Sequence, residues 1–223
     1  MKPILPELLC LPISLTKTDS LEAVEQAFHG HPSIGFQQAW LPAPQPNLLP
    51  TIVRTGWDSK AVWIFADMKD IAIHNSATKL NEHLWELGDV FECFVRPLPG
   101  LTYYEFHVSP ENQRLQLKFA NSQKHWEHKA AKEGMTSFML EGQAIQTHTW
   151  VTPGEEWKAL MRIPASTLHP KTPYHAGDVW KFSFSRYDVT DKVEDAVLSS
   201  SSPHKVCGYH RQQEWGTLKI ANR

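Results

Sequence analysis

Two neighbouring segments rich in aromatic and β-branched residues constrain the fold of this chain most. The first covers Val90–Val95, the second covers Tyr103–Ser109, and prolines and a glycine lie between them. This composition and spacing are typical of two strands joined by a short turn. Side chains alternate between the two faces of a strand, so Tyr104 and Phe106 are expected on one face of the second strand, with Val108 beside them.

One charged residue interrupts the first of these strands. Glu92 is a carboxylate in an otherwise apolar segment, and such groups are seldom buried without a partner. In the second strand, alternation places Glu105 and His107 on the same face. Antiparallel pairing would therefore bring Glu92 and His107 onto one surface, near Trp85. An aromatic side chain beside a carboxylate and an imidazole is a plausible site for a polar, ring-shaped ligand.

The rest of the chain repeats this pattern of short strands and turns. Further strands are expected at 36–40, 51–55, 61–66, 113–120, 157–163, 178–185, 198–202 and 216–220. Helix is expected only at 20–28, where Ser20 can act as a cap, and near Glu127–Lys132, followed by a strand before residue 146. Residues 1–20 are proline-rich and are expected to be irregular. We therefore predict an all-β fold, a two-layer antiparallel β-sandwich with minor helix.

Composition bears on the class of partner and on domain organisation. The 223 residues carry a formal net charge of −2, which provides no electrostatic reason to expect nucleic acid or an anionic membrane as a partner. No apolar run is long enough for a membrane span. No repeat or linker divides the chain, so we expect a single domain over 1–223, with 1–35 as an N-terminal extension.

Cysteines and the N-terminus bear on the compartment. The three cysteines, Cys10, Cys93 and Cys207, are widely spaced and fit neither a disulfide framework nor a zinc site. The first leucines are interrupted by prolines and a glutamate, and this makes a poor signal peptide. A reducing, cytoplasmic compartment is the default expectation.

Six segments of the chain, in this order, resemble those of the family 9 carbohydrate-binding modules. They are Trp57–Phe65 followed by Lys69 and Asp70; Trp85 with Asp89–Phe94; Tyr103–Val108; Glu156–Leu168; Trp180–Arg186; and Tyr209–Leu218. No single segment is distinctive, and the resemblance rests on their shared order over roughly residues 35–220.

The resemblance implies an immunoglobulin-like β-sandwich that holds a sugar, or the end of a sugar chain, between two aromatic side chains. Trp85 would be one of the two and Tyr209 the other. Glu92 would bind sugar hydroxyls, and His107 would be a basic hydrogen-bonding residue. The chain departs from the family pattern at two of these positions, because Tyr209 replaces a tryptophan and His107 replaces an arginine. On this basis we expect a non-catalytic domain that binds a carbohydrate or polyol.

The resemblance also implies one inorganic ligand. Family members can carry structural calcium in loops, and Asp58, Asp67 and Asp70 flank the early strands. Calcium needs six to eight oxygen ligands, and these three residues do not make a complete set. We therefore expect no cofactor beyond a structural calcium ion.

Other functions have weaker support in the sequence. A related kind of sandwich holds haem for electron transfer between a methionine and a histidine, and here Met68 with His74 or His210 would be the ligands. A glycosidase could use Glu92 and Glu105 as its acid and base, but the sequence cannot give their separation.

The remaining alternatives concern isolated features of the chain. His125 and His128 lie three positions apart and could share a metal on a helix, although no third ligand is near them. Ser199–Ser202 lacks the glycine-flanked context of a nucleophile. Trp85 could equally be a core residue, and a relative of the family could have lost its ligand. We find no catalytic motif and expect no enzymatic activity.

Overall fold

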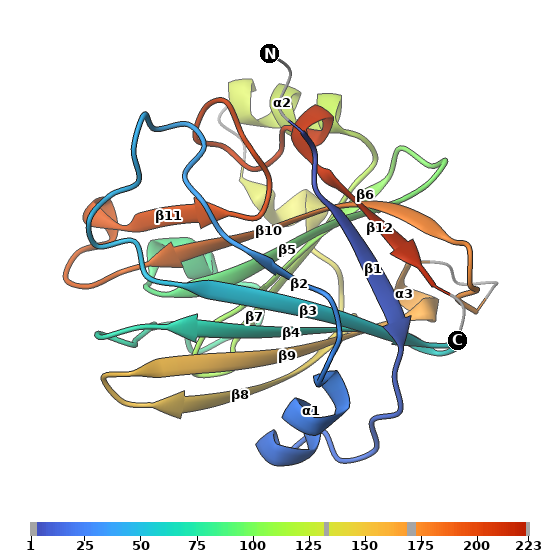
Figure 1. Ribbon diagram of the computed structural model, residues 1–223. Coiled ribbons are helices and arrows are strands. Elements are labelled where there is room, and N and C mark those ends of the chain that lie inside the picture. Colours follow the sequence, from blue (N-terminus) through green and yellow to red (C-terminus); the bar gives the residue numbers. More distant parts are fainter. Residues whose placement is uncertain (1–3, 132–133, 169–172, 222–223) are drawn as a thin grey trace.

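The computed structural model describes residues 4–131, 134–168 and 173–221, and these form two packed layers of strands (Figure 1). The first layer contains, in spatial order, β7 (Arg114–Phe119), β6 (Tyr103–Val108), β5 (Val90–Pro97), β10 (Val179–Asp188) and β12 (Gly216–Ile220), with β11 (Val197–Ser200) also paired to β10. The second contains β3 (Thr51–Asp58), β4 (Ala61–Lys69), β9 (Glu156–Pro164) and β8 (Gln146–Thr152), with β2 (Ser33–Gly35) on β3. The predicted β-sandwich with little helix is confirmed.

The N-terminal segment differs from the expectation of an irregular chain. It forms the strand that joins the two layers. β1 (Glu7–Pro12) pairs parallel with β12 through Glu7–Cys10 and parallel with β3 through Leu11 and Pro12. Leu8 and Cys10 are buried while Glu7 and Leu9 are exposed, which is strand alternation. Prolines at either end of this short segment concealed the pattern. The sheet is consequently mixed, with its parallel pairings at β1.

The segment 36–40 also differs from expectation. It forms no strand, and only Gln37 makes an isolated bridge, to Ser200. The side chain of Gln38 instead exchanges hydrogen bonds with Gln45 across the following loop, with its Nε2 2.6 Å from Gln45 Oε1 and its Oε1 2.8 Å from the Gln45 amide.

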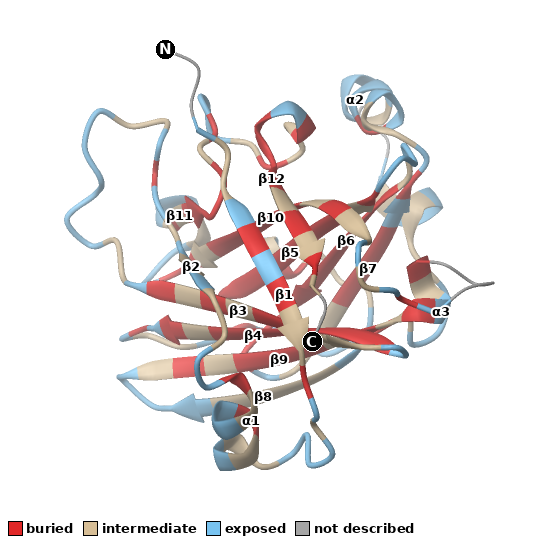
Figure 2. Ribbon diagram, turned by 45° about the vertical axis from the view of Figure 1, so that its right-hand side comes forward, coloured by how far each residue is buried: buried red, intermediate tan, exposed pale blue. Residues whose placement is uncertain are grey.

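Both faces of the first layer are covered. On β5, Phe91, Cys93 and Val95 pack into the core between the layers, whereas Glu92 and Phe94 face outward. The outward face would be solvated in a simple sandwich, yet it carries a second apolar cluster that includes Phe94, Tyr103, Phe119, Tyr209 and Trp215. Figure 2 shows the buried residues continuing through these strands. A site on this outer face is therefore sheltered from water.

Short helices and single turns lie around both layers, and the first helix packs on the second layer. The helices are α1 (Leu21–Phe28), α2 (Ser122–Ala131) and α3 (Ala165–Leu168), with single turns η1 (Leu84–Glu86), η2 (Met135–Phe138), η3 (Val193–Asp195) and η4 (Gln212–Glu214). α1 is confirmed with its cap, because Ser20 Oγ accepts a hydrogen bond from the Ala23 amide at 3.3 Å. The second predicted helix corresponds to α2, although Lys132 lies outside the described residues. Among the described residues, no helix has the length and apolar content needed to cross a bilayer.

Candidate functional site

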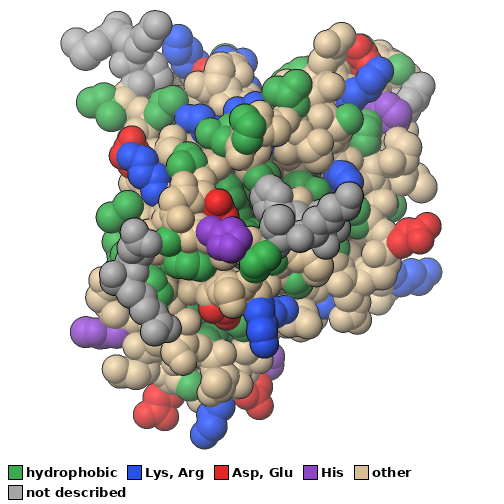
Figure 3. All heavy atoms as spheres, turned by 90° about the vertical axis from the view of Figure 1, so that its right-hand side faces the viewer, with side chains coloured by type: hydrophobic (Ala, Val, Ile, Leu, Met, Phe, Trp, Pro, Cys, Tyr) green, Lys and Arg blue, Asp and Glu red, His purple; other side chains and the backbone are tan. Residues whose placement is uncertain are grey.

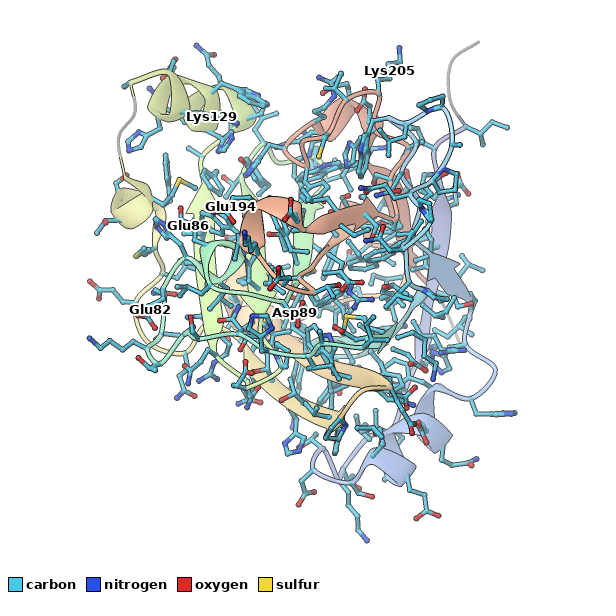
Figure 4. All side chains as sticks on the ribbon, turned by 90° about the vertical axis from the view of Figure 1, so that its left-hand side faces the viewer. Glu82, Glu86, Asp89, Lys129, Glu194 and Lys205 are labelled. Atoms are coloured by element: carbon cyan, nitrogen blue, oxygen red, sulfur yellow. The ribbon has the colours of Figure 1, made fainter. Side chains whose placement is uncertain are left out.

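A cavity of about 510 Å³ opens on the outer face of the first layer. Its walls are formed by Trp85 of η1, Glu92 and Phe94 of β5, Glu105 of β6, Tyr187 of β10, Leu198 of β11, His125 and Lys129 of α2, Met135 of η2, and the loop Cys207–His210. Figure 4 shows Lys129 on α2 and Lys205 on the C-terminal loop at opposite sides of this end of the molecule. In Figure 3 the surface is hollowed between two lobes at the same end.

The structure brings three of the four sequence-predicted residues to this cavity. Trp85, Glu92 and Tyr209 line it. Glu92 pairs directly opposite His107 in the ladder between β5 and β6, as the strand pattern predicted. His107, however, is fully buried and is not part of the lining; its Nε2 atom lies 2.7 Å from Glu105 Oε1 and 3.5 Å from Glu92 Oε1. It therefore supports the two carboxylates from behind.

The two predicted aromatic residues have different surroundings. Trp85 is half-buried and stacks on His83, with ring centroids 4.8 Å apart and an interplanar angle of 12°. Tyr209 is buried, and its hydroxyl group has no hydrogen-bond partner within the described part of the chain. Its ring lies 6.2 Å from Phe94 and 6.1 Å from Tyr187. An unpartnered buried hydroxyl at a cavity wall is available to a ligand.

Three ionisable side chains lie close together at the cavity floor. Burial raises the pKa of Glu92 to about 7, although the His107 imidazole opposes the shift. Burial would also raise the pKa of Glu105, but the imidazoles of His210 and His107 outweigh it and lower that pKa. Burial would lower the pKa of His107, but Glu92 and Glu105 outweigh it and raise that pKa. These shifts favour the charged forms of Glu105 and His107, and Glu92 titrates close to neutral pH.

Two histidines of the cavity were missed as site residues by the sequence analysis. The rings of His125 and His210 stack with centroids 3.5 Å apart and an angle of 13°. His125 comes from α2, in the stretch that has no counterpart in the resemblance, and only its spacing from His128 drew attention to it. His125 and His128 do not share a set of neighbours, because His128 contacts Phe138 and its Nε2 atom lies 3.1 Å from Ser137 Oγ.

The buried position of His125 on α2 makes the stability of the folded protein sensitive to acid. Burial and the neighbouring His210 lower the pKa of His125 to about 3. An unfolded histidine takes up a proton below pH about 6.5, so as the pH falls the unfolded state binds more protons and stability is lost. At pH 5 this difference in proton binding would lower the free energy of unfolding by about 2 kcal/mol. We expect about 1 kcal/mol after solvent screening.

The variant His125→Phe should remove this sensitivity, because a phenyl ring can pack on Phe119, now 5.4 Å away, without a titratable nitrogen. Urea unfolding at pH 7 and pH 5 measures the difference. The exposed residue His29 supplies the control, since His29→Phe should keep the full pH dependence. If lowering the pH from 7 to 5 reduced the stability of His125→Phe as much as that of the parent protein, His125 would not be the source of the pH dependence.

The loop that carries Tyr209 is held by a buried polar chain. Ser183 Oγ lies 3.4 Å from His204 Nε2, and His204 Nδ1 lies 3.2 Å from Glu214 Oε2. The order of groups resembles a hydrolytic triad, but Ser183 is fully buried and does not line the cavity, and Arg211 forms two hydrogen bonds to Glu214. Trp215 Nε1 also donates to the Tyr209 carbonyl at 2.7 Å. These contacts position Tyr209 against the sheet.

A second cluster of buried carboxylates lies away from the cavity, and Arg186 is the cation that pairs with it. Asp70, Asp89 and Asp188 place oxygens within 4.8 Å of one another. The Nη2 atom of Arg186 lies 2.8 Å from Asp70 Oδ2 and 3.2 Å from Asp188 Oδ2. The guanidinium group therefore provides the positive charge that a metal ion would otherwise supply.

The aspartates expected to hold calcium each have a separate partner. Asp58 accepts hydrogen bonds from the amides of Lys60 and Ala61, Asp67 lies 3.6 Å from Lys158 Nζ, and Asp70 is paired with Arg186. A structural calcium ion remains a prediction.

The haem alternative does not fit the arrangement of one proposed ligand pair. Met68 is buried in the core between the layers, whereas His210 lies at the cavity on the opposite face of the first layer. One haem cannot use both as axial ligands, because the sheet lies between them. His74 is exposed and its Nδ1 atom lies 3.1 Å from the Ala72 carbonyl.

Comparison with known proteins shows a shared fold. No family model matches the chain. A curated protein of Arthroderma benhamiae, named an extracellular protein, is 27% identical over 164 residues, which are 70% of this chain and 72% of that protein. A candidate carbohydrate-binding protein from Bacteroides uniformis superposes with a TM-score of 0.72 at 18% identity, over 96% of this chain and 98% of that one.

Two further solved structures are those of a family 9 carbohydrate-binding module from Caldicellulosiruptor kristjanssonii. The complex with cellotriose has a TM-score of 0.66 at 12% identity and covers 98% of this chain and 95% of that one. The complex with glucose has a TM-score of 0.63 at 11% identity, over 98% and 97% of the two chains. The chain has the fold of the family 9 carbohydrate-binding modules, as the resemblance implied.

Proposed function

We propose that this cavity binds a carbohydrate, either a single sugar or the end of a sugar chain. The observation that supports this most is a cavity of about 510 Å³ with aromatic walls and two buried carboxylates. Small-ligand sites commonly have this size and combine apolar walls with a few polar groups. Solved neighbours of the same fold are complexes with cellotriose and glucose, which favours this ligand class.

Each lining residue has a role suited to a sugar ring. The C–H groups of a sugar form an apolar face that packs on an aromatic ring, and half-buried Trp85 offers such a surface. Glu92 and Glu105 can accept hydrogen bonds from hydroxyl groups, and a charged acceptor makes the stronger bonds. The Tyr209 hydroxyl can bond a further hydroxyl. His107 acts behind them, by holding Glu92 and Glu105 in place, rather than by direct contact with the ligand.

Binding without catalysis fits the carboxylates better than glycoside hydrolysis. Glu92 and Glu105 both lie beside the same atom, His107 Nε2, at 3.5 and 2.7 Å. A retaining glycosidase separates its carboxyl groups by about 5–5.5 Å so that they act on opposite sides of one bond. An oxygen of Glu92 and an oxygen of Glu105 lie within 4.8 Å of each other, closer than that spacing, and both carboxylates are on the same side of the cavity floor beside His107.

Thermal unfolding in the presence of sugars tests the proposal. The panel contains glucose, cellotriose, galactose, mannose, xylose, N-acetylglucosamine and the polyol inositol, and any hit is then titrated by calorimetry. A ligand at 100 times its dissociation constant should stabilise the protein by about 2.7 kcal/mol. Failure of every compound to shift the transition would contradict carbohydrate binding and favour a relative that has lost its ligand.

A further inference from the structure

We propose that Glu92, Glu105 and His107 form a site for one divalent first-row transition-metal ion at the floor of the cavity. Each residue offers a donor atom, and these atoms lie within 4.8 Å of one another. The three side chains are almost completely buried, with 3%, 4% and 0% of their residue surfaces exposed. They come from facing positions of β5 and β6, so a rigid sheet fixes their arrangement.

The hydrogen bonding of the two carboxylates points independently to a missing partner. Within the described residues Glu92 accepts no hydrogen bond, and its ion-pair partner is His107 Nε2 at 3.5 Å, with the like-charged Glu105 beside it. Oε2 of Glu105 is also buried without a hydrogen-bond partner, and its contact with His210 Nε2 is a long one of 3.5 Å. Buried carboxylate oxygens are normally paired, because desolvating them without compensation is costly. Both carboxylates line the cavity, so an ion could reach them from solvent.

The donor set indicates the class of ion. An imidazole nitrogen and two carboxylate oxygens suit zinc and its neighbours in the first transition row, whereas calcium prefers six to eight oxygens. Coordination through Nε2 requires a neutral His107, so the two carboxylates would carry the charge that balances a divalent ion. Three protein ligands leave a coordination position facing the cavity, where water or a ligand hydroxyl can bind.

Metal titration in the absence of any sugar tests this site separately from the proposed function. After dialysis against a chelator and removal of the chelator, calorimetric titration with zinc chloride should show one ion per chain. The variants His107→Gln and Glu105→Gln should weaken zinc binding at least about 10-fold, because each removes a ligand. His148→Gln is the control: this half-buried histidine on β8 lies in the other layer and should leave the affinity unchanged.

Cobalt provides a second readout that needs no variant. Cobalt(II) bound by a few protein ligands should give the parent protein visible absorption bands that an equimolar addition of zinc abolishes. No zinc binding by the parent protein, or equal zinc binding by parent and both variants, would overturn the proposal and assign any uptake to other histidines. If a variant does not fold, the cobalt spectrum of the parent protein decides. Sugar binding can succeed or fail in either case, since the metal titration contains none.

Discussion

Replacing Arg186 by methionine is expected to destabilise the protein by about 3–5 kcal/mol, because the buried carboxylates of Asp70 and Asp188 would lose the cation that pairs with them. The guanidinium group is 1% exposed. Its Nη2 atom bonds Asp70 on one side, and its Nη1 atom donates to the Lys69 carbonyl at 2.7 Å and to Thr51 Oγ1 at 3.2 Å. Arg186 lies on β10 and its partners lie at β3 and the end of β4, so the residue ties the two layers together.

The loss in Arg186→Met should depend on pH in a definite direction. Burial already raises the pKa of Asp188 to about 6 and that of Asp89 to about 7. Arg186 opposes the shift at Asp188, so without this cation the pKa of Asp188 should rise further above its unfolded value. When a carboxyl group has a higher pKa in the folded state than in the unfolded state, the folded protein is less stable at pH values above that folded pKa. This loss disappears as the pH falls, because the group is then protonated in both states. The deficit should therefore be full at pH 8 and smaller at pH 5.

Chemical denaturation of the parent protein and two variants at both pH values measures this. Lys219→Met is the control, because Lys219 forms an exposed ion pair of 2.7 Å with Glu7 and such pairs contribute about 0–1 kcal/mol. A deficit below about 1 kcal/mol in Arg186→Met, or one that does not change with pH, would show that Arg186 does not balance these carboxylates.

Most strands could be predicted because their alternation is local. β5 and β6 carry regular inward and outward residues, and the pairing of Glu92 with His107 follows from that alternation and a short turn. β1 could not be predicted in the same way. Only Leu8 and Cys10 face inward in a segment bounded by prolines, and what stabilises the strand is its contact with β12, about 210 residues later in the chain.

The site was predictable only where strand pairing or the resemblance linked its parts. Tyr209 entered through the resemblance alone, and its distance in sequence from Glu92 gave no physical reason for contact. Arg186 and Asp70 each stood in a recognised segment, yet nothing in either segment indicates that they form an ion pair across the layers. His125 lies on α2, a mostly polar helix with no residue other than His125 buried, so no apolar stripe marks the face that covers the cavity.

Truncation of Trp85 to alanine is expected to weaken sugar binding by at least about 30-fold, which corresponds to about 2 kcal/mol. The variant loses ring stacking, worth about 0.5–1.5 kcal/mol beyond buried area, and the apolar area that the indole would cover on the ligand. It should cost less stability than the 3–5 kcal/mol typical of a core tryptophan, because Trp85 is half-buried at the cavity wall. We expect a loss of about 1–2 kcal/mol.

Trp150 supplies the matched control, since it is also half-buried but lies on β8 in the other layer and packs on a different cluster. Trp150→Ala should cost comparable stability and leave sugar binding intact. Calorimetric titration with the sugar that binds the parent protein best, combined with thermal unfolding of all three proteins, separates the two effects. If Trp85→Ala keeps the parent affinity, the indole does not contact the sugar. If both variants lose binding equally, general destabilisation explains the loss, and Trp85 has no special role at the cavity wall.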